Sequence, residues 1–352
     1  MKPSEVIHGG EAGRYFKDYG LEPRPYLDFS VNLSPLGPPP AMLRALPSVQ
    51  VVDRYPERQG QPLIDYYQRR FGLLAERILP LNGSIEGIYL WAHKLRPQRP
   101  LVLDPGFGDY QAALAPFAQE IVHHSLVAPD FDLASLEAAL PGCDACLVGS
   151  PHNPTGTALD AKQWASLLGR WPEVNFLVDQ AFLGLSDDPQ GLSLLDLAFP
   201  NLWVLLSLTK EFACPGLRLG ALISPQDQAA FWLSELPPWR LSGPALAAVE
   251  ALAEEADYLP NLQVNLNQSR QEVFRALSAL PRCQPTPSRA NFFWVRYGGD
   301  IDALLGAALQ AGFFLRDGRS FLGLEDAAYF RLGLKTAAEN RQLLEFLARY
   351  LA

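Results

Sequence analysis

The stretch LWVLLSLTKEFACPGLRLGALIS, Leu202 to Ser224, holds two apolar runs that flank a short segment with two isolated cations. The runs LWVLLS and LGALIS are rich in Leu, and near-continuous apolar runs of this length are typical of strands covered on both faces. Between the runs lie one lysine, Lys210, and one arginine, Arg218, which follows a Pro-Gly turn signal. The stretch therefore predicts two buried strands whose connection carries both cations.

Similar apolar runs recur through the first two thirds of the chain. Helical spacing follows each of them, and the runs end at Asp104, Ser150, Asp179, Ser207 and Ser224. Strands that alternate with helices in this way predict an α/β fold with a mostly parallel sheet. In such sheets ligands bind outside the carboxyl ends of the strands, so the first four of these residues are expected to face one crevice.

The chain is expected to divide into three parts. Beyond Pro237, a long helical stretch from Gly243 to about Leu280 leads into the strand-like ANFFWVRYG, and helices and strands then alternate to the end. This pattern predicts a smaller α+β domain over residues 241–352, after a large α/β domain over residues 41–240. Residues 1–40, which contain the proline-rich SVNLSPLGPPP, are expected to form an N-terminal arm.

The composition is that of a globular protein, since 48% of the 352 residues are hydrophobic and 19% are charged. A formal net charge of −9 argues against a nucleic-acid partner, because binding to a phosphate backbone requires clustered Lys and Arg. No segment approaches the ~18 apolar residues of a membrane span, and the N-terminus lacks the apolar run of a signal peptide. We therefore expect no membrane partner and a cytoplasmic location.

The four cysteines are too few for a disulfide framework. Cys143 and Cys146 form a C-x-x-C pair, but a zinc site needs a second pair of ligands, which neither Cys214 nor Cys283 supplies. We therefore expect no metal site, and we interpret CDACLVGS as a buried strand edge.

The surroundings of Lys210 suit a nucleophilic amine. Apolar neighbours lower the pKa of a lysine, and a neutral amine can attack an aldehyde; the alternative is a lysine that extends from a strand end to solvent. Arg218, after its Pro-Gly turn, can clamp a phosphate with the Ser207 hydroxyl beside it. In NGSIEGIYL, Gly83 and Ser84 lead into a helix whose free N–H groups favour an anion, or they simply cap that helix.

Two further polar residues follow buried strands. Asp179 closes NFLVD and can hold a protonated ring nitrogen by a charge-assisted hydrogen bond, or it can cap a helix. Asn153 lies in SPHNPTG, where two prolines and a glycine make a rigid turn that can aim an amide into the crevice, or that is only a turn.

Together these residues resemble the pyridoxal-phosphate enzymes of fold type I, the aminotransferase class I and II superfamily. The resemblance spans nearly the whole chain and rests on a specific series of motifs, which is N-P-T-G, a strand-end Asp, S-x-x-K and G-x-R-x-G. It implies pyridoxal 5′-phosphate as cofactor, with Lys210 on its aldehyde, Asp179 on its pyridine nitrogen and Asn153 on its ring 3′-oxygen. It places around the cofactor phosphate Gly83, Ser84, Ser207 and Arg218.

The resemblance also implies an aromatic wall and a second subunit. Phe107 in DPGFGDY matches the aromatic residue that stacks on the cofactor ring, with Tyr110 close by. Tyr55 in DRYPE matches a tyrosine that reaches the phosphate from the neighbouring subunit. A homodimer with its active site at the interface is therefore expected.

Within the superfamily, the N-terminal motifs are similar to those of threonine-phosphate decarboxylases of cobalamin biosynthesis. These motifs are H-G-G, with His8, and D-F-S-x-N, with Asn32. They imply decarboxylation of the small phosphorylated amino acid L-threonine O-3-phosphate to (R)-1-amino-2-propanol O-2-phosphate. The alternatives are a histidinol-phosphate-type aminotransferase and, more remotely, a non-catalytic module that only binds the cofactor.

Two other positions bear on this choice. Phe182 in D-Q-A-F stands where the aminotransferases have a tyrosine that bonds the ring 3′-oxygen, which favours the decarboxylase. In the C-terminal segment, Arg331 matches the residue that pairs with the substrate carboxylate, and Arg316 is the second candidate for substrate binding. His8 matches a residue that closes over the substrate phosphate, although a histidine in an arm is often solvated.

Some positions depart from the family pattern. These are Ser34 for Asn, Gln180 for Glu, Gly318 and Arg319 for a pair such as Cys-Ser, and Lys335 for Arg. Arg319 can bind the substrate phosphate or lie in water, and we leave both interpretations open.

Overall fold

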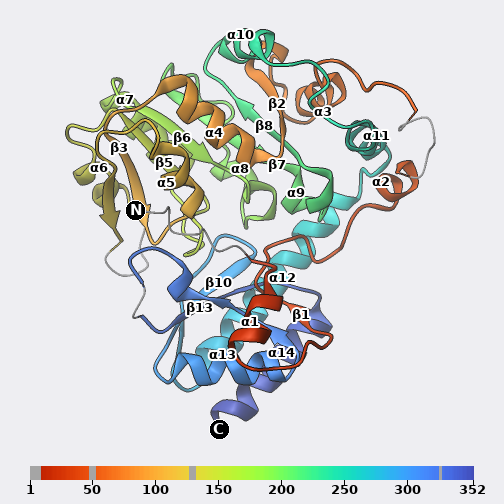
Figure 1. Ribbon diagram of the computed structural model, residues 1–352, viewed down its shortest axis with the longest axis vertical. Coiled ribbons are helices and arrows are strands. Elements are labelled where there is room, and N and C mark those ends of the chain that lie inside the picture. The colour runs from red at the N-terminus through yellow and green to blue at the C-terminus, as the bar shows by residue number, and fades with distance from the viewer. Residues whose placement is uncertain (1–8, 47–52, 127–131, 325–326) are drawn as a thin grey trace.

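In the computed structural model, residues 9–46, 53–126, 132–324 and 327–352 are described, and two sheets organise them (Figure 1). The larger sheet has the strand order β2-β8-β7-β6-β5-β3-β4. Its strands are β2 Ile78–Asn82, β3 Pro100–Asp104, β4 Val122–Ser125, β5 Ala145–Gly149, β6 Asn175–Asp179, β7 Leu202–Ser207 and β8 Leu219–Ile223. Only β8 runs antiparallel to its two neighbours, β2 and β7. The predicted α/β fold with a mostly parallel sheet is confirmed.

Both faces of the larger sheet are covered, because successive side chains of each strand enter different cores. On β6, Phe176 and Val178 enter one core and Leu177 enters the other. Helices α4 Ser84–Leu95, α5 Gly108–Leu114 and α10 Gln228–Glu235 supply apolar side chains to the second core. Helix α7 Ala161–Arg170 packs into the first. Burial on both faces explains why the strands read as unbroken apolar runs.

The smaller sheet is antiparallel and lies in the lower half of Figure 1. Its order is β12-β13-β10-β9, and its strands are β9 Cys283–Pro285, β10 Phe292–Tyr297, β12 Arg316–Asp317 and β13 Tyr329–Gly333. Helices α13 Ile301–Gln310 and α14 Ala337–Leu351 complete this small α+β domain. The remaining helices of the larger part are α2 Pro40–Ala45, α3 Gln61–Phe71, α6 Leu133–Ala139, α8 Pro189–Leu192 and α9 Leu208–Glu211.

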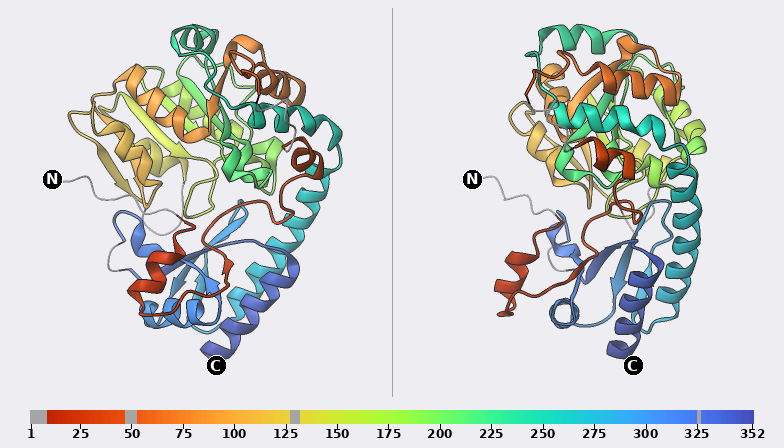
Figure 2. Two further views of the ribbon diagram at one scale, coloured as in Figure 1. Left: turned by 45° about the vertical axis from the view of Figure 1, so that its right-hand side comes forward. Right: turned by 90° about the vertical axis from the view of Figure 1, so that its right-hand side faces the viewer.

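The predicted helical stretch from Gly243 to Leu280 is two helices and not one. Helix α11 Gly243–Ala251 packs against α2 and α3, and helix α12 Tyr258–Ala279 runs alongside the small domain (Figure 2). The acidic segment between them forms a 3₁₀ turn at Leu252–Glu254, and the Glu255 carboxylate after it accepts a hydrogen bond from the Ala41 N–H at 2.6 Å. Since α11 belongs by its contacts to the larger part, the domain boundary at residue 241 stays a prediction.

The N-terminal segment packs on the small domain before it crosses to the large one. Helix α1 Ala12–Asp18, which the sequence did not suggest, buries Ala12 and Phe16 against Leu309 and Phe314. Strand β1 Leu27–Asp28 then pairs in parallel with β11 Phe313–Phe314. Residues 29–37, here named the strap, follow without helix or strand. Among the described residues no helix has both the length and the apolar character needed to cross a membrane.

Gly220 on β8 provides a testable feature of the large sheet. A Cβ at this position would lie 2.6 Å from the Ser84 amide nitrogen and 2.9 Å from the Leu206 carbonyl oxygen, and backbone atoms cannot move away cheaply. We expect Gly220→Ala to lower the free energy of unfolding by about 2 kcal/mol. Urea denaturation of the purified variants measures this change.

The matched control is Gly13→Ala in α1, where a Cβ meets no atom within 4 Å. Alanine there should stabilise the helix by about 0.5–1 kcal/mol. Equal stability of the two variants would show that β8 does not approach the Ser84 turn as closely as described.

Candidate active site

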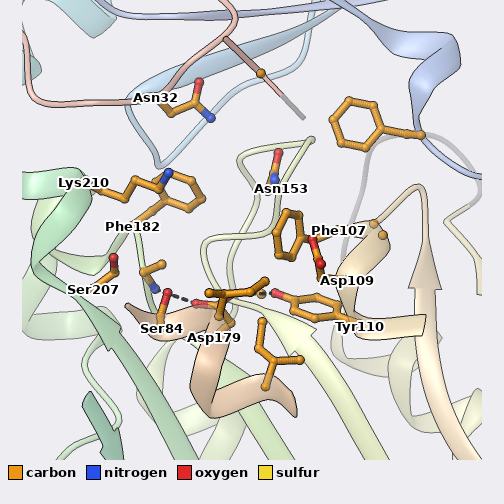
Figure 3. Close-up of a pocket in the computed structure, with 18 of the residues that line it drawn as sticks. Asn32, Ser84, Phe107, Asp109, Tyr110, Asn153, Asp179, Phe182, Ser207 and Lys210 are labelled. Carbon is orange, nitrogen blue, oxygen red and sulfur yellow. Dashed lines mark hydrogen bonds between the residues drawn. The ribbon is translucent and has the colours of Figure 1, made fainter. Parts of the chain in front are cut away.

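A cavity of about 770 Å³ lies at the carboxyl edge of the large sheet and extends to the small domain (Figure 3). Of the four strand-end residues expected there, Asp179 and Ser207 line it. Asp104 instead accepts a hydrogen bond from His123 Nδ1 at 2.8 Å through its Oδ2, and Ser150 is fully buried beside Trp164. The crevice prediction was therefore right for two residues and wrong for the other two.

The antiparallel course of β8 brings Lys210 and Arg218 to the same edge of the sheet. Because β7 ends where β8 begins, the short connection that contains α9 and a 3₁₀ turn at Pro215–Leu217 stays at the cavity. Both cations line it. Lys210 and Arg218 therefore both lie in the single tight connection between β7 and β8.

The amine of Lys210 is buried, and its pKa is lowered to about 8. Burial is the main cause, and the positive charges of Arg331 and Arg218 add to it, whereas Asp179 acts in the opposite direction. An amine with this pKa is neutral in a large fraction of molecules near pH 8 and is nucleophilic in that form. The alternative of a lysine that extends to solvent is therefore wrong.

Asp179 is held in a fixed orientation at the floor of the cavity. Its Oδ1 accepts a hydrogen bond from the Ala181 N–H at 2.9 Å, and its Oδ2 accepts one from the Tyr110 hydroxyl at 3.0 Å (Figure 3). Burial raises the pKa of Asp179, and these hydrogen bonds together with the charge of Lys210 counteract the rise. The carboxylate forms a local turn and caps no helix, and it can accept a charged N–H from a bound ring.

Gly83, Ser84, Ser207 and Arg218 form an anion cradle at one end of the cavity. Gly83 has a φ of 84° and precedes α4, whose first turn has no side-chain cap, and the start of a helix favours an anion. A Cβ on Gly83 would lie 2.2 Å from Arg218 Nη2, so the guanidinium lies directly against this glycine. Ser84 and Ser207 line the same cavity. A helix N-terminus, a guanidinium and two hydroxyls suit a phosphate group.

Two aromatic side chains face the cavity between the cradle and the small domain. The Phe107 ring meets the Tyr110 ring edge-on with centroids 5.5 Å apart, and the Phe182 ring meets Phe292 in the same way at 5.0 Å. Phe107 and Phe182 both line the cavity (Figure 3). They present apolar surfaces against which a flat ring can pack.

The small domain contributes two buried arginines. Arg316 and Arg331 are directly opposite each other on the antiparallel strands β12 and β13, and both guanidinium groups lie over the Phe321 ring, at 5.2 and 5.8 Å. Burial and the charge of Arg316 lower the pKa of Arg331 to about 9, and burial also lowers the pKa of Arg316. Like charges opposite each other are unfavourable, so this end of the cavity attracts an anion.

Asn153 and Asn32 lie near this arginine pair. Asn153 lines the cavity, and its Oδ1 accepts a hydrogen bond from Arg331 Nη1. Arg331 Nη2 also donates to the Ser30 carbonyl oxygen. Asn32 is buried in the strap and lines the cavity. The structure thus joins Asn153 to the arginine side of the site.

One predicted site residue lies outside the cavity, and another cannot be placed. Tyr55 is outside the cavity and 83% exposed, with its ring 4.9 Å from that of Trp239. This exposure is what a residue that serves a neighbouring subunit requires. His8 lies outside the described residues.

The departures from the family pattern have local explanations. Gln180 Nε2 donates to the Leu192 carbonyl oxygen at 2.7 Å while its Oε1 accepts from the Leu194 N–H at 3.1 Å, and a glutamate could not make the first bond once ionised. A Cβ on Gly318 would come within 2.5 Å of the Tyr329 carbonyl oxygen. Local packing and hydrogen bonding therefore explain both Gln180 and Gly318.

Arg319 lies at the cavity rim, where Asp302 and Asp317 both bind its guanidinium. These two ion pairs show that Arg319 does not simply lie in water, while binding of a substrate phosphate by Arg319 stays a prediction. Lys335 is half-buried outside the cavity, and burial lowers its pKa.

Two polar or aromatic residues of the cavity wall, Phe321 and Asp109, were not among the predicted site residues. Phe321 contacts both arginines, and Asp109 is buried at the start of α5, where it accepts a hydrogen bond from the Tyr89 hydroxyl at 3.2 Å. Both occur inside motifs that carried other assignments, and no spacing signal distinguishes them. Within the described residues, no group of three or more His, Cys, Asp or Glu side chains is arranged to hold a metal ion.

A buried nucleophilic lysine, a strand-end carboxylate and a phosphate cradle at the edge of an α/β sheet define a pyridoxal-phosphate enzyme of fold type I. The family model for aminotransferase class I and II matches residues 24–347, and the chain belongs to that family. The protein is therefore an enzyme whose cofactor is pyridoxal 5′-phosphate, and the residues of the cavity fit this group.

Similar proteins include both decarboxylases and aminotransferases. The chain is 32% identical over 351 residues to a threonine-phosphate decarboxylase from Salmonella typhimurium, with 98% of this chain and 96% of that protein covered. It is 29% identical over 310 residues to a histidinol-phosphate aminotransferase from Idiomarina loihiensis, with 85% and 86% covered. A histidinol-phosphate aminotransferase from Sinorhizobium meliloti, solved with pyridoxal-5′-phosphate, has the same fold, with a TM-score of 0.83, 20% identity, and coverage of 99% and 96%.

The lowered pKa of Lys210 predicts how the cofactor-free protein captures pyridoxal phosphate. Only the neutral amine reacts, so the rate of capture should rise with pH and have its midpoint near 8, and not near the ordinary lysine value of 10.5. Stopped-flow absorbance from pH 6 to 10 measures the rate. Lys210→Ala is the control and should bind the cofactor without the visible absorption of the lysine adduct. A midpoint near 10.5 would contradict the burial of this amine.

Proposed function

We propose that this protein decarboxylates L-threonine O-3-phosphate to (R)-1-amino-2-propanol O-2-phosphate, the reaction implied by its similarity to threonine-phosphate decarboxylases. The observation that carries the proposal is the pair of buried arginines, Arg316 and Arg331, opposite each other on β12 and β13. L-threonine O-3-phosphate has two anionic groups, a carboxylate and a phosphate. Two guanidinium groups on one wall match the substrate with two anions.

Phe182 supports the same choice. It lines the cavity and packs edge-on against Phe292, and it has no hydroxyl to offer a ring oxygen. The corresponding tyrosine is typical of the aminotransferase. The 32% identity with the Salmonella decarboxylase over almost the full chain agrees with this assignment.

The residues of the cavity divide the work of holding the cofactor. Lys210 would bind its aldehyde, Asp179 its ring nitrogen, and the anion cradle its phosphate. When bound, pyridoxal phosphate accepts the electron pair of the substrate bond that is aligned with its ring π system. The contribution of the protein is to decide which bond is aligned and to exclude water from it.

Arg331 and Arg316 would supply that orientation by binding the carboxylate and the phosphate of the substrate. The reaction removes the carboxylate as carbon dioxide and puts a proton on the α-carbon in its place. Lys210 Nζ, with a pKa near 8, can carry that proton at neutral pH and deliver it. In an aminotransferase the same amine would instead remove the proton from the α-carbon.

The proposed reaction is tested by its products. Purified holoenzyme is given L-threonine O-3-phosphate and carbon dioxide is measured, while a parallel sample receives histidinol phosphate with 2-oxoglutarate and glutamate is measured. We expect carbon dioxide without any keto-acid requirement. Glutamate formation without carbon dioxide release would overturn the proposal and identify an aminotransferase. Lys210→Ala is the control and should be inactive in both assays.

We further propose that the active enzyme is a homodimer in which Tyr55 reaches the cofactor phosphate of the partner. The exposed position of Tyr55 outside the cavity of its own chain supports this arrangement. The symmetry of a dimer would then complete two equal sites.

Mixing two inactive variants tests the shared site. If Tyr55 acts on the partner, a mixed dimer of Lys210→Ala and Tyr55→Ala subunits has both defects in one site. The other site then keeps both Lys210 and Tyr55 intact. We expect refolded mixtures to be more active than the sum of the two variants alone. Activity equal to that sum, in mixtures shown to contain mixed dimers, would place Tyr55 in the site of its own chain.

A further inference from the structure

The strap, residues 29–37, is bonded to the small domain along its first half. The Phe29 carbonyl oxygen accepts from the Gly333 N–H at 2.8 Å, and the Leu33 carbonyl oxygen accepts from Asn291 Nδ2 at 3.3 Å. Arg331 donates to the Ser30 carbonyl oxygen between these two points. This half of the strap therefore moves with the strand that carries Arg331.

The second half of the strap is bonded to the backbone of the lysine helix α9. The Ser34 N–H donates to the Lys210 carbonyl oxygen at 2.8 Å. The Ser34 Oγ lies 2.8 Å from the Tyr258 hydroxyl oxygen, and both residues are buried. Ser34 thus lies at the junction between the strap and the backbone of the cofactor lysine.

The Tyr258 hydroxyl joins three segments at this junction. It lies 2.7 Å from the Gly37 carbonyl oxygen and 3.1 Å from the Glu211 carbonyl oxygen. Carbonyl oxygens only accept hydrogen bonds, so the single Tyr258 hydroxyl proton is shared between these two oxygens and the Ser34 hydroxyl donates to Tyr258. Ser34 Oγ in turn accepts from the Leu36 N–H at 3.3 Å. The proton directions are therefore consistent throughout.

Tyr258 is also the first residue of α12, the helix that runs alongside the small domain (Figures 1 and 2). One hydroxyl consequently ties together the strap, the end of α9 and the start of α12. Neither Ser34 nor Tyr258 lines the cavity, so neither can touch a substrate there.

Asn32 lies between the two anchored halves of the strap. It is buried and lines the cavity, and its Oδ1 has no hydrogen-bond partner among the described residues. A Cβ on Gly333 would come within 3.0 Å of this oxygen, so the amide is packed closely against β13. Its position relative to Lys210 depends on the anchor two residues later at Ser34.

We propose that Ser34 and Tyr258 are positioning residues that hold the Asn32 side chain in register with Lys210 for substrate binding. The inference explains the serine at position 34, which the sequence marks only as a departure from a more usual asparagine. It rests on Asn32 binding the substrate, which is part of the proposed function, and it does not depend on which substrate bond is broken.

A double-mutant cycle tests whether Tyr258 acts through Asn32. Binding of L-threonine O-3-phosphate to the holoenzyme is followed by the change in visible absorption of the cofactor. We expect Tyr258→Phe and Asn32→Ala each to raise the dissociation constant about tenfold, because small misplacements of a binding group are costly. The double variant should bind no more weakly than Asn32→Ala alone, since the tyrosine then has no asparagine to position.

Tyr66→Phe is the matched control. Its hydroxyl is also buried beside Glu211, where it accepts a hydrogen bond from Arg70 at 2.8 Å, but it does not contact the strap. This variant should keep the dissociation constant of the unaltered enzyme. Ser34→Ala removes the other hydroxyl of the junction and should also be non-additive with Asn32→Ala, which keeps the test available if Tyr258→Phe does not fold.

Three outcomes would overturn the inference. These are additive effects of Tyr258→Phe and Asn32→Ala, unchanged substrate binding in either single variant, and an equal loss in Tyr66→Phe. Absence of carbon dioxide release is a separate result, because it rejects the decarboxylase and leaves the cycle to be measured with histidinol phosphate as the probe. The visible absorption and cofactor affinity of Tyr258→Phe without substrate should match those of the unaltered enzyme, and a loss there would place the effect on Lys210 instead.

Discussion

The burial of one amine, that of Lys210, is the constraint on which the rest of the site depends. A lysine that leaves water must lose its proton or gain a partner, and here burial and two neighbouring arginines together outweigh the single carboxylate of Asp179. The amine is consequently poised between its charged and neutral forms near neutral pH. A site that captures an aldehyde and then moves a proton needs both forms of the same group.

The charged groups that act on Lys210 come from several separate segments of the chain. Lys210 follows the end of β7 and Arg218 precedes the start of the antiparallel strand β8, so both lie at the same edge of the sheet. Gly83 has no side chain and leaves room for the Arg218 guanidinium beside the start of α4. Asp179 reaches the floor from β6, with Tyr110 holding one of its oxygens. The large sheet therefore builds the cofactor side of the site almost alone.

The small domain builds the other side. Arg316 and Arg331 meet across two antiparallel strands, and the shared ring of Phe321 covers both guanidinium groups. The strap connects the two sides, because it is bonded to the small domain at Phe29 and Leu33 and to the lysine backbone through Ser34. The cavity is thus lined by residues of both parts, which the strap joins by hydrogen bonds.

The sequence by itself determined the α/β class and singled out candidate residues at the ends of the buried strands, because buried parallel strands must be apolar and polar residues at their ends stand out. Lys210, Asp179 and the Gly83–Ser84 turn became candidates for that reason. Only the tertiary structure decided that Asp104 and Ser150 lie outside the cavity, that the helical stretch after Gly243 breaks, and that Phe321 lies under both arginines while Tyr258 bonds to Ser34. These features arise from contacts between segments far apart in the chain, such as Tyr258 with Ser34 and Glu255 with Ala41. Such contacts cannot be predicted from the local sequence, because the sequence around a serine or an aromatic residue does not depend on which distant residue it contacts.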